Sequence, residues 1–323
     1  MSRRQGPTWA ATSVPEIRRQ WCNAVDQSVD RFSQGLAPPP PGTPEAGNKR
    51  RERMQAKLAT EMEIMKAEND ALRGAEMFWV ARDMVDVALH AALTLPEWTP
   101  AIAAPAPNGL LCWARPAGSV PYGPKQTSTT DVPWDSVWWW IRPGGMMQLV
   151  TASRFTKQRD LIAQFQVSTP LWAANTIVID PKEARTEEAN GTEDSHPFVS
   201  VVGAAWLLMA QANVAETRTI GSQPQPQPRT TRTDMPAPAP REPSTVTIVE
   251  LRQKPAARER EPDPAAAGRT YTHRWPVEGY WRQQPYGPNN SQRKPKYITD
   301  HVKGPEGAPL IRKDRVHVLR KGR

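Results

Sequence analysis

The sequence has few cysteines and no long apolar run, and each shortage excludes a class of protein. Cys22 and Cys112 are its only cysteines, too few for a disulfide scaffold or a cysteine-based zinc site. The longest apolar run, 198–210, is interrupted by Ser200 and is too short to span a bilayer. No apolar segment follows the arginines near the N-terminus, so we expect no secretory signal. We therefore predict a cytoplasmic protein that does not insert into membranes.

Familiar catalytic motifs are also missing. The sequence contains no G-x-x-x-x-G-K-[ST] loop, no G-x-G-x-x-G fingerprint, no H-E-x-x-H and no C-x-x-C. Asp131, Asp135 and Asp180 lie near expected strands, but their spacing is not diagnostic of a divalent-cation site. We therefore predict neither a metal site nor a cofactor, and we favour binding over catalysis.

Proline, by contrast, is abundant, and it limits how much of the chain can pack. With 35 Pro and 19 Gly in 323 residues, about one residue in six disfavours regular structure. Thirteen Trp are nevertheless more than a disordered chain usually carries. We therefore expect modest folded cores joined by Pro-rich linkers, the clearest of which are 37–44 and 221–243.

Helical and strand-like patterns occur in separate parts of the chain, which predicts an α+β fold. We expect a helical N-terminal part, a small central sheet flanked by helices and a small antiparallel β module at the C-terminus. The predicted segments are an N-terminal helix with its linker (1–45), a long helix (46–95), a central α+β domain (96–220), a Pro-rich linker (221–243) and a basic β module (244–323) containing a polar loop (253–268).

Hydrophobic periodicity places the elements within these segments. It predicts helices over 14–36, over 48–93 with a division at Gly74, and over 199–216. The part after Gly74, residues 77–93, reads as a buried helix. Strands are predicted at 108–116, in a hairpin over 132–155, and at 176–180; the C-terminal module would contain 245–251, 269–282, 297–302 and 316–320. Trp138, Trp139 and Trp140 must alternate between the two faces of their strand. One ring could serve as a platform for a base or another ligand, but we favour a sheet that is covered on both faces.

The long helix carries an apolar seam that suggests a short parallel coiled coil. Leu58, Met65 and Leu72 recur every seven residues, and Asn69 occupies the position at which asparagine fixes the register of two-stranded coils. These four residues are our candidate homodimer interface. The preceding segment 48–58 is rich in Lys and Arg, but it does not match the spacing of basic-zipper proteins, and we interpret it as a solvated basic helix start.

The net charge of +9 is concentrated in the last sixth of the chain. Residues 269–323 contain 13 Lys and Arg against four acidic residues, which equals the whole excess. They also contain four of the five Tyr, two Trp and three of the five His. Cations that neutralise phosphates, interleaved with rings that stack on unpaired bases, are typical of nucleic-acid-binding surfaces. A small basic β-domain with an aromatic core would have the same composition.

Two functions are compatible with the residue types of this module. The candidate nucleic-acid contacts are Arg274, Trp275, Tyr280, Trp281, Arg282, Tyr286, Arg293, Lys294, Lys296 and Lys303. Alternatively, a metal-free, toxin-like ribonuclease could use His273 as base, His301 as acid and Arg282 as phosphate clamp. Because the same residues suffice to bind phosphates, we favour binding without chemistry.

The C-terminal module also resembles a known family. HRWPVEGYWRQQPYGP (273–288), then KYITDHVKGPEGAPL (296–310) and a closing VHVL, are similar to a module H-R-W-x-V-x-G-H-W-R-x-Q of uncharacterised proteins from actinobacteria, their phages and mobile elements. LTLP (93–96) and PNGLLCW (107–113) match the middle of those proteins. The resemblance implies a phage or mobile-element context but no mechanism, because that family has no assigned function. Tyr280 stands where the family often has His, which argues against an essential acid or base there.

These observations lead to three hypotheses for function. The first is a non-enzymatic nucleic-acid-binding accessory protein of a phage or mobile element, with DNA and RNA both left open. The second is the metal-free ribonuclease, and the third is a protein–protein scaffold that uses the helix at 46–93.

Overall fold

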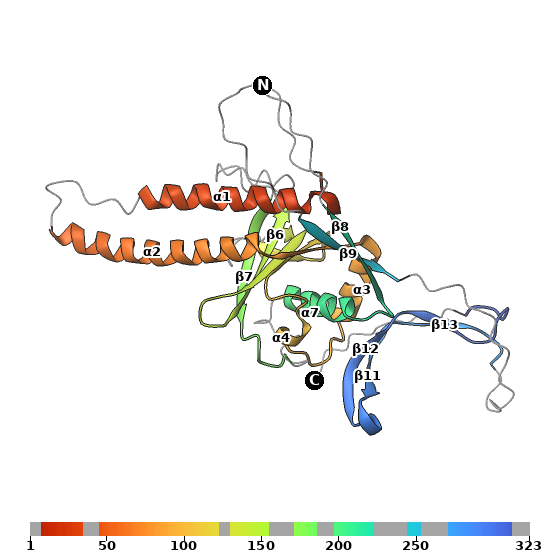
Figure 1. Cartoon of the computed structure of the whole chain (residues 1–323). Coiled ribbons are helices and arrows are strands. Elements are labelled where there is room, and N and C mark those ends of the chain that lie inside the picture. Colours follow the sequence, from red (N-terminus) through yellow and green to blue (C-terminus); the bar gives the residue numbers. More distant parts are fainter. Residues whose placement is uncertain are drawn as a thin grey trace, which may run out of the picture.

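A mixed β-sheet lies between two helical layers in the computed structural model of the chain (Figure 1). The structure describes residues 8–34, 45–122, 130–154, 171–185, 197–221, 244–252 and 271–311. A helical hairpin of α1 (Val14–Gln34) and α2 (Glu45–Arg73) lies on one face of the sheet. The other face is covered by α3 (Arg82–Ala92), α4 (Pro100–Ala103) and α7 (Pro197–Met209). The α+β fold class predicted from the sequence is confirmed.

The sheet has seven strands in the order β7-β6-β5-β2-β1-β9-β8. Within this order β1 (Glu76–Val80) runs parallel to both of its neighbours, β2 (Gly109–Trp113) and β9 (Thr245–Leu251). The remaining pairs are antiparallel and add β5 (Ser136–Ile141), β6 (Met147–Arg154) and β7 (Leu171–Ile179) on one side and β8 (Ala215–Gly221) on the other. Smaller elements are the 3-10 turns η1 (Ala11–Ser13) and η4 (Pro288–Asn290) and the pair β3 (Ser119–Tyr122) and β4 (Thr130–Pro133).

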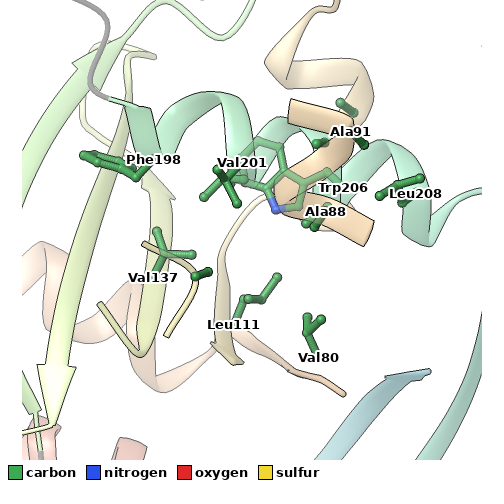
Figure 2. Close-up of a cluster of buried hydrophobic side chains, with 14 of the residues drawn as sticks. Val80, Ala88, Ala91, Leu111, Val137, Phe198, Val201, Trp206 and Leu208 are labelled. Carbon is green, nitrogen blue, oxygen red and sulfur yellow. The ribbon is translucent and has the colours of Figure 1, made fainter. Parts of the chain in front are cut away.

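The main core lies between the sheet and the α3–α7 layer. Trp206 of α7 lies beside Ala88 and Ala91 of α3, with Leu111 of β2 and Val80 of β1 beneath them (Figure 2). All five side chains are buried. Alanines at the contact let the two helices approach closely, so one large indole fills the space between them.

Both faces of the sheet are covered, as the three successive tryptophans of β5 predicted. Trp138 faces the helical hairpin, where its ring centroid lies 5.0 Å from that of Trp21 in α1. Trp139 faces the opposite layer, 4.8 Å from the ring of Trp206, and its indole N–H donates to the carbonyl of Ala106 at 2.8 Å. These tryptophans are core residues and offer no platform to a ligand.

The prediction of a buried helix over 77–93 is wrong in its first part. Residues Glu76–Val80 form β1, an inner strand of the sheet, and α3 begins only at Arg82. The predicted long helix of 46–95 therefore ends at Arg73. The pattern of a short apolar run such as MFWV fits a buried strand and a buried helix equally well. Its pairing with β2 and β9 makes it a strand here.

The strand predicted at 245–251 forms, but in a different place. It is β9, which pairs with β1 and β8 in the central sheet and is not part of the C-terminal module. The predicted helix 199–216 also ends earlier, at Met209, and β8 begins at Ala215. The stretches 37–44, 222–243 and 253–268 and the predicted strand at 316–320 lie outside the described residues.

The residues predicted to form a homodimer seam are used within the chain. Asn69 is buried and donates to the carbonyl of Cys22 at 3.2 Å and to Asp26 at 2.7 Å, both in α1. Leu72 is buried against the sheet, while Leu58 and Met65 are half-buried on the helical hairpin. Asn69 and Leu72 are therefore not available to a second copy, and Asn69 fixes the pairing of α2 with α1 instead.

Candidate nucleic-acid interface

The described part of the C-terminal segment forms an antiparallel ribbon of two short ladders, which extend away from the central sheet in different directions (Figure 1). Its strands are β10 (Trp275–Val277), β11 (Tyr280–Tyr286), β12 (Gln292–Ile298) and β13 (His301–Lys303), with β10 paired to β13 and β11 to β12. Val277 opposes His301 and Tyr280 opposes Ile298, so the same register runs through both ladders. The strand predicted at 269–282 is thus two strands, interrupted at 278–279.

The inner face of the β11–β12 ribbon is docked on the α3–α7 layer by two aromatic rings. Tyr297 is 2% exposed, and its ring centroid lies 5.1 Å from that of Trp281. The indole N–H of Trp281 donates to the carbonyl of Ala91 near the end of α3, at 2.9 Å. Burial raises the pKa of the Tyr297 hydroxyl to about 12, and the negative charge of Asp300 adds to this rise.

Hydrogen bonds to the ribbon backbone fix this docking. The amide N–H of Tyr297 donates to Oε1 of Gln211 at 2.7 Å, and its carbonyl accepts from Nδ2 of Asn213 at 3.0 Å. Directly before β11, Nε2 of His90 lies 3.2 Å from the carbonyl oxygen of Gly279. A Cβ at position 279 would lie 2.3 Å from the hydroxyl oxygen of Tyr297, so only glycine permits this approach.

The outer face of the ribbon is basic and aromatic. Because side chains alternate along a strand, the residues on this face are Tyr280, Arg282, Gln284 and Tyr286 of β11 and Gln292, Lys294, Lys296 and Ile298 of β12. Tyr280 and Tyr286 are each 40% exposed, and Nζ of Lys294 lies 5.2 Å from the ring centroid of Tyr286. Neither strand contains Asp or Glu. We call the set Tyr280, Arg282, Tyr286, Lys294 and Lys296 the outer ribbon face.

Half of the ten predicted nucleic-acid contacts therefore share one face, and the others lie elsewhere. Trp281 is on the inner face and serves in docking, so it is not displayed for stacking on a base. The guanidinium of Arg274 donates to the carbonyl of Ala308 at 2.8 Å, which ties down the segment after β13. Arg293 is exposed near the β11–β12 turn, where its guanidinium donates to the carbonyl of Asn290 at 2.6 Å.

The last two predicted contacts oppose each other in the β10–β13 part of the ribbon. Trp275 pairs with Lys303 across the two strands. The ring centroid of Trp275 lies 4.8 Å from that of Tyr271 and 5.7 Å from that of His273. This second aromatic group is smaller than the outer ribbon face and has one cation, Lys303, opposite it.

The three residues predicted for RNA cleavage do not form a common site. His273 contacts the ring of Trp275, whereas His301 opposes Val277 further along the ribbon, and its Nδ1 lies 3.0 Å from the carbonyl oxygen of Thr299. Arg282 lies in β11 and contacts Gln284. Among the described residues, no hydrogen bond or ring contact joins any two of the three. The geometry therefore gives the ribonuclease hypothesis no support.

The described ribbon carries only part of the C-terminal charge. Residues 271–311 contain six basic and three acidic side chains. The other seven basic residues of the segment lie outside the described residues. Four of the six cations lie in β11 and β12, whereas all three acidic residues lie outside the four strands, so the charge of the β11–β12 ladder has one sign.

The described residues form neither a metal-binding cluster nor a membrane-spanning helix. No group of three or more His, Cys, Asp and Glu residues is placed to hold a metal ion there. Asp135, one of the three aspartates considered above, is buried and accepts from the backbone N–H and the guanidinium of Arg154, both at 3.1 Å. No helix in the described ranges is both long and apolar enough to cross a membrane.

Sequence reasoning missed the residues that dock the ribbon, which are Gln211, Asn213, Gly279 and His90. Only Gly279 gave a signal, because a glycine inside a strand-like run often marks a close approach of another chain segment. Gln211 and Asn213 follow α7 and had no pattern that distinguished them from ordinary solvent-exposed amides.

Comparisons with known proteins add one weak likeness. No family model matches the chain, and no curated protein matches it. A solved structure titled "Crystal structure of AcrVA2" aligns over 90% of this chain and 97% of its own, with 11% sequence identity and a TM-score of 0.35. At this identity and TM-score we base no argument on the likeness.

Proposed function

We propose that this protein is a non-enzymatic nucleic-acid-binding protein and that the outer ribbon face is its contact surface. The observation that supports this is the composition of that face, which joins three cations and two exposed tyrosines on a ribbon whose strands lack acidic residues. Cations neutralise phosphates and release their counterions, and the tyrosine rings stack on unpaired bases. The phage or mobile-element context remains a proposal that rests on the sequence resemblance.

Docking of the inner face supports the same proposal. A two-stranded ribbon alone is marginally stable in water, but here Trp281 and Tyr297 attach it to the α3–α7 layer. The outer face is thereby held rigid while it remains exposed. A rigid surface loses less conformational entropy on binding than a mobile one.

Charge neutralisation on the full chain tests the phosphate contacts. We expect Arg282→Gln, Lys294→Gln and Lys296→Gln together to weaken binding of labelled nucleic acid by about tenfold or more at ~0.1 M salt. The slope of log affinity against log salt should become shallower by about 2 for a single strand and about 2.7 for a duplex. The matched control carries Lys66→Gln, Arg82→Gln and Lys182→Gln, three exposed cations in other parts of the molecule. An equal effect in both triple variants, or no binding by the unaltered chain at low salt, would refute the proposal.

Removal of the rings distinguishes stacking from charge. Tyr280→Ala with Tyr286→Ala should lower the affinity for single strands more than that for duplexes, because only unpaired bases offer a free face. The salt slope should stay unchanged, since no cation is lost. Equal losses with both polymers would show that the rings do not stack on bases.

A further inference from the structure

The first part of α2 is a second exposed basic surface that the proposed function does not use. α2 extends past the end of α1, so its N-terminal part has no helix beside it (Figure 1). Lys49, Arg50, Arg53 and Lys57 are all exposed in this part of the helix. Among the described residues, no ion pair engages these four side chains.

The four cations lie on one side of the helix. With 3.6 residues per turn, each residue turns the helix by about 100°, which places Lys49, Arg53, Lys57 and Arg50 within an arc of about 100°. Asn69, which bonds to α1, lies about 200° from Lys49 and therefore on the opposite side of α2. No acidic residue between positions 49 and 60 falls within the same arc. We call these four residues the basic stripe of α2.

This arrangement is unfavourable for the helix itself. Lys49 and Arg53, and likewise Arg53 and Lys57, are like charges four residues apart, which repel each other across one turn. An ordinary solvated helix face mixes the two signs of charge, whereas a bound polyanion would relieve the repulsion within the stripe.

We infer that the basic stripe of α2 is a second contact for the phosphate backbone of the same nucleic acid. This inference rests on the proposed function. A row of cations of one sign complements a row of phosphates, and the stripe shows none of the aromatic residues that anchor protein partners. The start of α2 and the β11–β12 ladder lie far apart in the molecule (Figure 1), so only a long polymer would contact both. Linking two weak contacts in this way raises the overall affinity.

A second charge-neutralised variant of the full chain tests the inference. Lys49→Gln, Arg53→Gln and Lys57→Gln remove three cations while glutamine keeps the helical propensity high. With a long labelled duplex, the slope of log affinity against log salt should become shallower by about 2.7, as for the ribbon variant. The Lys66, Arg82 and Lys182 triple variant is again the control, and it includes a cation on α2 itself beyond the stripe. Circular dichroism of each variant reports whether α2 is retained.

The outcomes separate the two claims. If the stripe variant and the control have the slope of the unaltered chain while the ribbon variant does not, the inference is wrong and the proposed function stands. If the stripe variant alone has a shallower slope, the ribbon is not a contact, so the proposed function of the outer ribbon face fails, and with it the inference that the stripe is a second contact beside it. If the unaltered chain binds neither a duplex nor a single strand at low salt, both claims fail. If the stripe variant and the ribbon variant both have a shallower slope of log affinity against log salt than the control, the inference is supported.

Discussion

At the scale of single residues, Glu68 shows how a charged group can join two layers. It lies on α2 and accepts from the indole N–H of Trp138 at 2.7 Å and from the side-chain amide of Gln148 at 2.9 Å. Burial raises the pKa of this carboxyl above its ordinary value, although the two hydrogen bonds and the positive charge of Arg142 oppose the rise. Its ionised form therefore weakens the fold while its contacts connect the helical hairpin to the sheet.

The raised pKa of Glu68 has a consequence for stability that depends on pH. The folded state binds the proton of Glu68 more tightly than the unfolded chain does. The protonated carboxyl therefore makes its full contribution to the free energy of unfolding below about pH 4, near the ordinary pKa of Glu. This contribution is lost as pH rises through the pKa of Glu68 in the folded state. We therefore expect Glu68→Gln to gain free energy of unfolding relative to the unaltered protein as pH rises from about 4 to 7. Denaturant titrations at several pH values measure this difference. The exposed Glu61→Gln on the same helix is the control, and a pH-independent difference for Glu68→Gln would contradict the expectation.

The two cysteines are also residues whose burial determines their chemistry. Burial raises the pKa of the Cys22 thiol to about 11 and that of Cys112 further still. Both side chains are buried and free. Their thiols are therefore protonated at neutral pH and serve as packing groups, which is consistent with the absence of any cysteine motif from the sequence.

At the scale of elements, the helical hairpin shows how the same asparagine can have two opposite roles. In a coiled-coil dimer, asparagine in the seam costs stability, and leucine at that position would strengthen association. In this chain Asn69 donates to Cys22 and Asp26 of α1, and Arg73 pairs with the same aspartate. Polar contacts within the chain therefore set the pairing of the two helices.

Asn69→Leu distinguishes these roles. Leucine cannot donate to either oxygen in α1, so we expect the free energy of unfolding to fall by about 1 kcal/mol. The melting temperature should not depend on protein concentration, because the contact lies within one chain. Thermal unfolding at several concentrations measures both quantities. A more stable variant whose melting temperature rises with concentration would instead establish the coiled-coil dimer.

The ribbon is an element protected against further strand pairing. Pro285 of β11 and Pro295 of β12 lack the N–H that a third strand would need. The lysines and arginine of the outer ribbon face also repel another ribbon of the same kind. These features keep an exposed two-stranded structure from associating with its copies and leave its surface open.

At the scale of the whole molecule, β9 joins the C-terminal part of the chain to the central sheet. It lies between β1 and β8 and forms hydrogen-bonded ladders with both. The ribbon then returns to α3 and to the residues after α7 through Trp281 and Tyr297. A fragment that begins at residue 244 would therefore take an inner strand away from the sheet.

Cleavage of the folded chain tests whether the C-terminal part belongs to the same folded unit as the central sheet. A protease site inserted between residues 222 and 243 should yield two fragments that stay together on native size-exclusion chromatography, because β9 remains paired on both sides. The same fragments should separate in denaturant, which confirms that the cut is complete. Fragments that separate without denaturant would show that the C-terminal part is an independent domain.

The sequence by itself determined those features that depend on local pattern. The spacing of apolar residues located α1 and α7, and the strand-like pattern over 132–155 located the hairpin of β5 and β6. Alternation of Trp138 and Trp139 required a sheet covered on both faces. Composition also directed attention to the basic aromatic segment that contains the outer ribbon face. Each of these depends on neighbours within a few positions, which a sequence displays directly.

Only the tertiary structure decided the partners of each element. Whether MFWV became a helix or β1, whether 245–251 joined the module or the sheet, and whether Asn69 met a second chain or α1 all depended on contacts between distant residues. The same holds for the candidate interface, because burial of Trp281 and exposure of Tyr280 follow from which face of the ribbon docks on α3. Local patterns give an element two faces, and long-range packing chooses the one that is buried.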